Sequence, residues 1–183
     1  MGLGVNMSRI VYVNGEYVPE ESAVISVFDR GFLMADAVYE VTSVLDGKRL
    51  EFDGHLKRLK RSLSELDMQE PDAINDLLEI HRTLVRDNQV DQGGVYLQVT
   101  RGVADRDFID HENVKSTLVM FTQSKDILGS KLVEKGMKVI SIDDLRWGRR
   151  DIKTVQLLYP SMGKMMAKSA KCDDAWMVED GFV

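Results

Sequence analysis

The sequence has little cysteine and proline and no long apolar run. A single cysteine, Cys172, among 183 residues excludes an internal disulfide and a cysteine-built zinc site, and suits a reducing compartment such as the cytoplasm. No apolar stretch approaches the length that spans a bilayer, so no membrane partner is expected. The three histidines, His55, His81 and His111, are scattered without metal-ligand spacing, and we expect no metal site.

The sequence also has no net positive charge and no phosphate-binding glycine motif. Acidic residues outnumber basic ones by 30 to 24, for a net charge of -6, so nucleic acid is a poor partner. There is no Gly-x-Gly-x-x-Gly sequence after a predicted strand and no Walker-type loop. The chain does contain 44% apolar and 30% charged residues, which predicts a globular protein with a core. Its length allows one domain, or one domain and the start of a second.

Two dipeptides predict tight β-hairpins, Asn14-Gly15 and Asp46-Gly47, because both residues of a type I′ turn need positive φ. The strands that they are expected to join are Ile10–Val13 with Tyr17–Val18, and Ala37–Leu45 with a return strand that includes Leu50 and Phe52. Gly93-Gly94 leads into a further predicted strand, Val95–Thr100, and Thr117–Thr122 is another.

Leucines at spacings of three and four predict an amphipathic helix between these strands; they are Leu56, Leu59, Leu63 and Leu66. A second helix is expected to start near Pro71-Asp72, where proline suits the first turn. Its predicted buried face consists of Ile74, Leu77, Leu78, Leu84 and Val85.

A polar stretch near Gln123–Leu132 predicts a linker between domains. We therefore divide the chain into an N-terminal α/β domain (7–123), a linker (124–132) and the beginning of a second domain (133–183). The second part is expected to contain a strand at Val139–Ile142, a helix from Gln156 to about Lys171, and a strand at Ala175–Val178. That last strand enters the Asp180-Gly181 turn, after which a return strand is expected.

Charged residues gather around Lys153, in the segment Arg149-Arg150-Asp151-Ile152-Lys153-Thr154. Cationic neighbours favour the neutral form of a lysine amine, and a neutral lysine can form a Schiff base with an aldehyde cofactor. The alternative is a solvated charged loop, and spacing alone does not exclude it.

His55, Arg58 and Ser62 are predicted to share one helix face beside the leucine stripe, because they lie at i, i+3 and i+7. An arginine in that position can bind a phosphate through its planar fork. The alternative is a solvated basic face formed by the run of lysines and arginines at 57–61.

Two further candidates lie in or after predicted strands. The arginines of the loop Arg101–Phe108 are placed to bind a carboxylate; alternatively they pair with Asp105 and Asp107 in a surface loop. Tyr39 and its neighbour Glu40 point to opposite faces of a strand. The alternative for Tyr39 is a core tyrosine whose hydroxyl is hydrogen-bonded.

Three stretches together resemble the class IV aminotransferases, the group that contains D-amino acid and branched-chain aminotransferases and aminodeoxychorismate lyase. They read DRGFLMADAVYEV (29–41), HLKRL (55–59) and RRDIKTVQLL (149–158). The resemblance runs from about residue 10 to the end of the chain. Within the group, YLQVTRGVADRDF (96–108) looks most like D-amino acid aminotransferase.

The resemblance implies a small N-terminal α/β domain, a linker and the start of a larger C-terminal α/β domain. It also implies an enzyme that uses pyridoxal 5'-phosphate to transfer an amino group between an amino acid and a 2-keto acid, and that works as a homodimer. Lys153 matches the lysine that forms the Schiff base and shuttles the proton, Arg58 the arginine that binds the cofactor phosphate, and Tyr39 a tyrosine beside cofactor and substrate.

The resemblance is less complete at the substrate loop and at the end of the chain. Arg106 matches the arginine of a carboxylate-binding Arg-x-His clamp, but Phe108 stands at the histidine position. The glutamate that pairs with the pyridine nitrogen is expected just past Val183, so a chain ending there should be incomplete as a catalyst. Two alternatives share the fold: an aminodeoxychorismate lyase, which releases pyruvate without a keto-acid acceptor, and a non-catalytic homologue, which would not develop the yellow colour of the bound cofactor.

Overall fold

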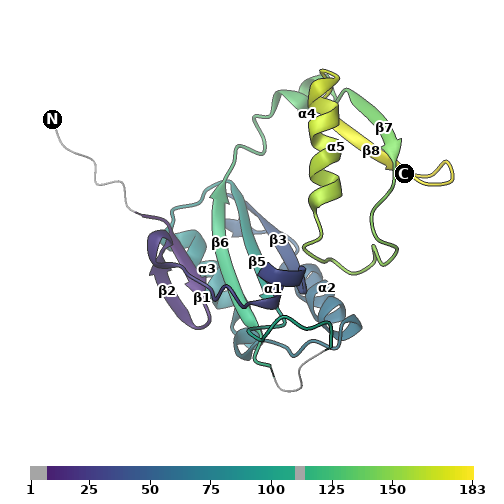
Figure 1. Cartoon of the computed structure of the whole chain (residues 1–183). Coiled ribbons are helices and arrows are strands. Elements are labelled where there is room, and N and C mark those ends of the chain that lie inside the picture. Colours follow the sequence, from purple (N-terminus) through teal and green to yellow (C-terminus); the bar gives the residue numbers. More distant parts are fainter. Residues whose placement is uncertain (1–7, 110–113) are drawn as a thin grey trace. The chain divides into compact units, whose positions relative to one another are not determined.

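The computed structural model describes residues 8–109 and 114–183 and contains two compact units (Figure 1). One unit consists of the described residues between 8 and 127 together with Ile152–Val155, and the other consists of Leu128–Asp151 and Gln156–Val183. His111, and the parts of the predicted first domain at 7 and 110–113, lie outside the described residues. The domain limits predicted from the sequence stay predictions.

The first unit is built on a six-stranded antiparallel sheet with the strand order β2-β1-β6-β5-β3-β4. Its strands are β1 (Ile10–Val13), β2 (Glu16–Pro19), β3 (Ala37–Leu45), β4 (Lys48–Arg49), β5 (Gly93–Thr100) and β6 (Thr117–Ser124). The predicted mixed α/β fold is confirmed.

Both predicted hairpin turns are confirmed, with positive φ at Asn14 (48°) and Gly15 (105°) and at Asp46 (50°) and Gly47 (67°). The prediction for the second return strand was wrong. Strand β4 ends at Arg49, so neither Leu50 nor Phe52 belongs to it. The reason is Glu51, whose φ of 51° turns the chain directly into α2 (Phe52–Glu65).

Helices α2 and α3 (Leu77–Asp87) pack their apolar stripes into the hydrophobic core that they form with the sheet. Leu59 and Leu63 of α2 and Leu77 and Leu84 of α3 are almost fully buried. The predicted start of α3 was early: Asp72–Asn75 forms a separate 3-10 turn, η2, after Pro71, with non-helical backbone at Ala73. The alternating residues of β3 and β5 that join this core include Val38, Val44, Val95, Leu97 and Val99.

A short helix, α1 (Arg30–Met34), lies just before β3; the 3-10 turn η1 (Glu20–Ser22) precedes it. Asp29 caps α1 by accepting a hydrogen bond from the Gly31 amide, at 2.8 Å. Gly31 is required here because a Cβ at this residue would lie 2.4 Å from Cγ2 of Thr100, at the end of β5. The chain therefore packs the 29–36 motif tightly against the point where β5 leaves the sheet.

The second unit contains α4 (Lys131–Lys135) and a β-α-β arrangement of β7 (Val139–Asp143), α5 (Leu158–Ser169) and β8 (Asp174–Val178). Strands β7 and β8 are parallel, and α5 connects them (Figure 1). The predicted helix and both predicted strands of this region are confirmed, with ends shifted by one or two residues. No helix in the described part of the chain is long and apolar enough to cross a bilayer.

Candidate active site

Lys153 lies at the edge of the six-stranded sheet, in the segment Ile152–Val155. Thr154 forms an antiparallel bridge with Val38, and the Tyr39 amide donates to the Lys153 carbonyl at 3.0 Å. The segment therefore runs beside the first half of β3, on the edge that β5 does not occupy. Backbone pairing, rather than a flexible loop, holds Lys153 in place.

Alternation along this segment separates its side chains. Ile152 is 3% exposed and belongs to the apolar core beneath the sheet, and Thr154 is also buried. Lys153 points to the other face, where its Nζ lies 4.1 Å from the centroid of the Tyr39 ring. The two candidates predicted from the sequence are thus direct neighbours, with the amine over the face of the ring.

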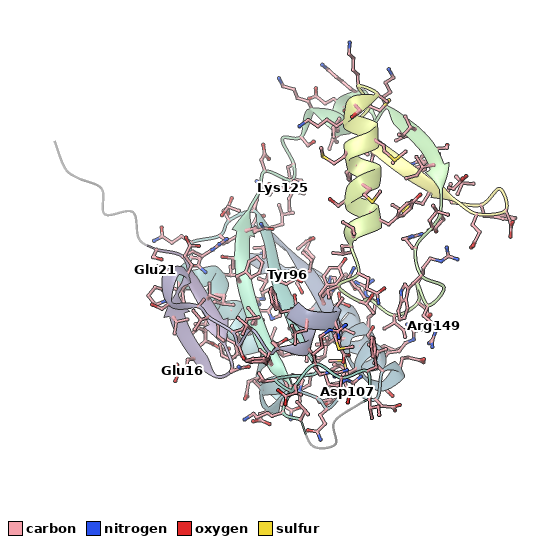
Figure 2. The ribbon with its side chains drawn as sticks, viewed as in Figure 1. Glu16, Glu21, Tyr96, Asp107, Lys125 and Arg149 are labelled. Carbon is pink, nitrogen blue, oxygen red and sulfur yellow. The ribbon has the colours of Figure 1, made fainter. Side chains whose placement is uncertain are left out.

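The same face of the sheet carries a row of stacked aromatic rings. The centroids of Tyr39 and Tyr96 are 5.7 Å apart, and those of Tyr96 and Phe121 are 4.8 Å apart. Tyr96, labelled on the sheet in Figure 2, donates its hydroxyl to Oε1 of Gln98 at 2.8 Å. Burial, with a smaller effect of Tyr39, raises the pKa of Tyr96 to about 12, so this hydroxyl stays protonated and does not serve as a base near neutral pH.

Glu40 forms an ion cluster on the helix-covered face, and the sequence reasoning did not single it out as a site residue. Its side chain is 3% exposed. Arg58 donates two hydrogen bonds of 2.7 Å to it, from Nε to Oε1 and from Nη2 to Oε2. Nδ1 of His55 lies 2.8 Å from Oε2. Glu40 is the one charged residue of β3 and lies at an inward position, and this was the signal that could have identified it.

The cluster fixes the ionisation of Glu40. Burial by itself would raise the pKa of this carboxyl, but the hydrogen bonds and charges of Arg58 and His55 together outweigh it and lower the pKa. The Glu40 carboxylate in turn raises the pKa of Arg58. The Arg58 side chain remains 47% exposed, and the fork to Glu40 uses two of the five N–H donors of a guanidinium. Arg58 is a fixed, permanently charged group with donors left for a ligand.

The predicted shared face of His55, Arg58 and Ser62 is observed on α2. His55 and Arg58 meet at Glu40, while the Lys153 amide points at Oγ of Ser62 over a long 3.4 Å contact. His81 of α3 has a different role, because burial lowers its pKa from 6.5 to about 4. It is therefore neutral near pH 7, and its Nδ1 lies 2.7 Å from the Leu77 carbonyl.

Arg106 and Phe108 lie on an exposed loop after β5. The Phe108 side chain is 80% exposed, and Cζ of Arg106 lies 5.3 Å from the centroid of its ring. Arg101, at the start of the loop, donates from Nε to Oδ2 of Asp36 at 2.8 Å. The structure therefore places Arg106 and Phe108, the two residues predicted to contact substrate, next to each other.

The two arginines before Lys153 belong to the second unit and are paired there. Arg149 forms two 3.0 Å hydrogen bonds to Asp151. Arg150 lies 2.8 Å from Asp144 and also binds Glu179. Hydrogen bonds from Arg146, together with its charge and that of Arg150, hold the pKa of Asp144 well below its usual range.

These donors fit a cofactor that has an aldehyde and a phosphate. The Lys153 amine supplies a nucleophile, and Arg58 supplies the N–H donors that its hydrogen bonds to Glu40 leave available for a phosphate. The described residues contain no group of three or more histidine, cysteine, aspartate or glutamate side chains that could hold a metal ion.

The fold is shared with solved aminotransferase structures. The Escherichia coli branched-chain amino acid aminotransferase matches with a TM-score of 0.83 at 16% identity, over 94% of this chain and 60% of that one. The T.th. branched-chain amino acid aminotransferase, solved with pyridoxamine 5'-phosphate, matches with a TM-score of 0.80 at 21% identity, over 94% of this chain and 60% of that one. A proposed 4-amino-4-deoxychorismate lyase from Legionella pneumophila matches at 0.75 and 22%, over 88% of this chain and 59% of that one.

Sequence similarity identifies the family. The model of the amino-transferase class IV family matches residues 37–183, so the chain belongs to the class IV aminotransferases, the group that its motifs resemble. It is 38% identical over 159 residues to the D-alanine aminotransferase of Staphylococcus epidermidis, and 33% identical over 176 residues to that of Bacillus licheniformis. These alignments include 86% and 94% of this chain but only 55% and 61% of the two relatives.

Proposed function

We propose that this chain contributes the catalytic lysine and part of the cofactor site of a pyridoxal-phosphate aminotransferase that moves an amino group between an amino acid and a 2-keto acid. The placement of the Lys153 amine 4.1 Å from the Tyr39 ring centroid carries this proposal. Support also comes from the family of the chain. When bound, pyridoxal phosphate would supply the electron sink for the chemistry at the substrate carbon.

The side chains have separate roles in this proposal. Nζ of Lys153 would hold the cofactor aldehyde and would carry the proton that leaves the substrate α-carbon. It must be neutral to accept that proton. The Tyr39 ring restricts where the amine can lie, and Arg58 binds the phosphate with the donors that Glu40 leaves available. A reducing compartment, such as the cytoplasm, is the proposed location.

Arg106 is proposed to bind the substrate carboxylate, with Phe108 setting the preference among side chains. Where the resemblance leads us to expect histidine, Phe108 presents an exposed apolar ring. Loss of one hydrogen-bond donor to a carboxylate costs about 1.5–3 kcal/mol, and apolar contact with phenylalanine contributes up to about 1.5–3 kcal/mol. We therefore expect weak activity on D-alanine and better activity on substrates with larger apolar side chains.

This prediction is tested by adding pyridoxal phosphate to the complete natural protein and measuring a panel of D- and L-amino acids with a keto-acid acceptor. Phe108→His should improve D-alanine relative to bulky substrates, and Arg106→Ala should weaken all of them. If D-alanine is already the best substrate and Phe108→His does not improve it, the loop does not set specificity. Pyruvate release without any acceptor would instead favour the lyase, and absence of yellow colour would favour a non-catalytic homologue.

A homodimer is the proposed assembly, and an exposed apolar surface supports it. The segment before α1 and the substrate loop lie side by side, since the Ala104 amide donates to the Phe28 carbonyl at 3.2 Å. Together with α1, they expose Phe28 (53%), Phe32 (69%), Val103 (50%) and Phe108. Neighbouring apolar side chains of this size mark protein interfaces. Light scattering of the complete protein should give twice the subunit mass; a fully active monomer would rule the dimer out.

A further inference from the structure

The motif 29–36 builds a buried charge cluster that the proposed function leaves unexplained. One carboxylate oxygen, Oδ2 of Asp36, accepts hydrogen bonds from Nε of both Arg30 and Arg101, each at 2.8 Å. The exposed fraction of the side chain is 15% for Asp36, 5% for Arg30 and 13% for Arg101. An arginine this deeply buried needs a carboxylate partner, so Asp36 holds both in place.

Arg30 connects this cluster to both ends of the substrate loop. Its backbone amide donates to the carbonyl of Gly102 at 2.8 Å. Its Nη1 donates to the carbonyl of Asp107, also at 2.8 Å. Asp107, labelled in Figure 2, lies between the two residues proposed to contact substrate. The Asp107 carbonyl belongs to the peptide bond that leads into Phe108, so this hydrogen bond restrains the backbone between Arg106 and Phe108.

The other side of the cluster is anchored to the body of the first unit. Arg101 donates from Nη2 to the Leu66 carbonyl at 2.8 Å and from Nη1 to the Asp67 carbonyl at 3.2 Å, at the C-terminal end of α2. A cation there also suits the helix dipole. The loop is therefore tied through Asp36 to the same helix that carries Arg58.

We propose that Arg30, held by Asp36, is a positioning residue that sets the conformation of the loop 101–109 and thereby presents Arg106 and Phe108 to the substrate. This inference rests on the proposed function for its effect on catalysis, but not for its effect on the loop. A planar guanidinium is needed because Nε binds Asp36 while Nη1 binds the Asp107 carbonyl. A lysine at this position can keep the charge pair but cannot hold both acceptors in that geometry.

The decisive variant is Arg30→Lys in the complete protein, with Arg82→Lys as the matched control. Arg82 is an exposed arginine of α3 that pairs with Glu79 at 3.2 Å. In Arg30→Lys we expect faster amide hydrogen exchange in a peptide covering 101–109, with exchange in β3 unchanged. KM for the amino acid should rise about tenfold with kcat changed less than about twofold, and with unchanged pyridoxal phosphate affinity. Arg82→Lys should change none of these quantities.

Asp36→Asn provides a second test that keeps the side-chain shape and removes the charge. It should loosen the loop and raise KM at least as much as Arg30→Lys, because two buried arginines lose their common partner. Unchanged exchange in 101–109, or a uniform loss of cofactor affinity, kcat and thermal stability, would overturn the inference. A different outcome is faster exchange in 101–109 of the variants but no transamination even by the wild type. It would overturn the proposed function and leave the role of Arg30 in holding the loop intact.

Discussion

Replacing Lys153 with alanine is expected to abolish the covalent attachment of pyridoxal phosphate to the complete protein. The physical reason is the position of the amine: the segment Ile152–Val155 pairs with β3 and places Nζ of Lys153 over the Tyr39 ring. Loss of this acid–base group should reduce transamination by at least about 10²–10⁴-fold. The measurements are the yellow absorbance and, after borohydride reduction, peptide mapping of the lysine that carries the cofactor.

Two variants make this test specific. Lys153→Arg places a permanent positive charge near Tyr39 and should also fail to attach the cofactor, because guanidinium stays protonated. Lys164→Ala removes a lysine of α5 that pairs with Asp174 at 2.6 Å, and should attach the cofactor normally. A borohydride adduct that maps to Lys164 or Lys168 in the wild type would show that Lys153 was assigned wrongly.

Replacing Arg58 with alanine is expected to weaken pyridoxal phosphate binding by about ten- to a hundredfold, since a charge-assisted contact contributes about 1.5–3 kcal/mol. Affinity for pyridoxal, which lacks the phosphate, should hardly change. This pair of ligands separates a phosphate contact from general damage to the site. Equal weakening of both ligands would return Arg58 to a purely structural role.

Arg58→Ala also removes two hydrogen bonds from the buried Glu40 carboxylate, whose remaining partner is His55. We therefore expect this variant to be less stable than the wild type. The double variant Arg58→Ala/Glu40→Gln should recover stability without recovering phosphate affinity.

Because the folded-state pKa of Glu40 is lowered, its pairing stabilises the fold fully above the ordinary pKa of 4.5, and this contribution is lost as pH falls through the lowered pKa. Thermal denaturation should therefore separate wild type and Arg58→Ala most clearly at neutral pH, and least in acid.

Local chemistry explains which features were predictable from the sequence. The turns at Asn14-Gly15 and Asp46-Gly47 depend on two residues that tolerate positive φ, and both formed as predicted. The leucine stripe of α2 depends only on spacing along one helix. The error at Phe52 arose because an apolar residue near a strand can equally begin a helix that packs on the same core. Leu50 lies between β4 and α2 and is 45% exposed.

By itself, the sequence determined the hairpins, the amphipathic helices and the motifs that mark Lys153, Arg58 and Tyr39 as candidates. Only the tertiary structure decided that Lys153 returns to the edge of β3 to meet Tyr39, and that Glu40 joins Arg58 to His55. Alternation along β3 predicts that Tyr39 and Glu40 face opposite ways, but not what each face meets. That depends on which distant segment completes the sheet edge and which helix crosses it, and such long-range pairing is settled by burying the whole core at once.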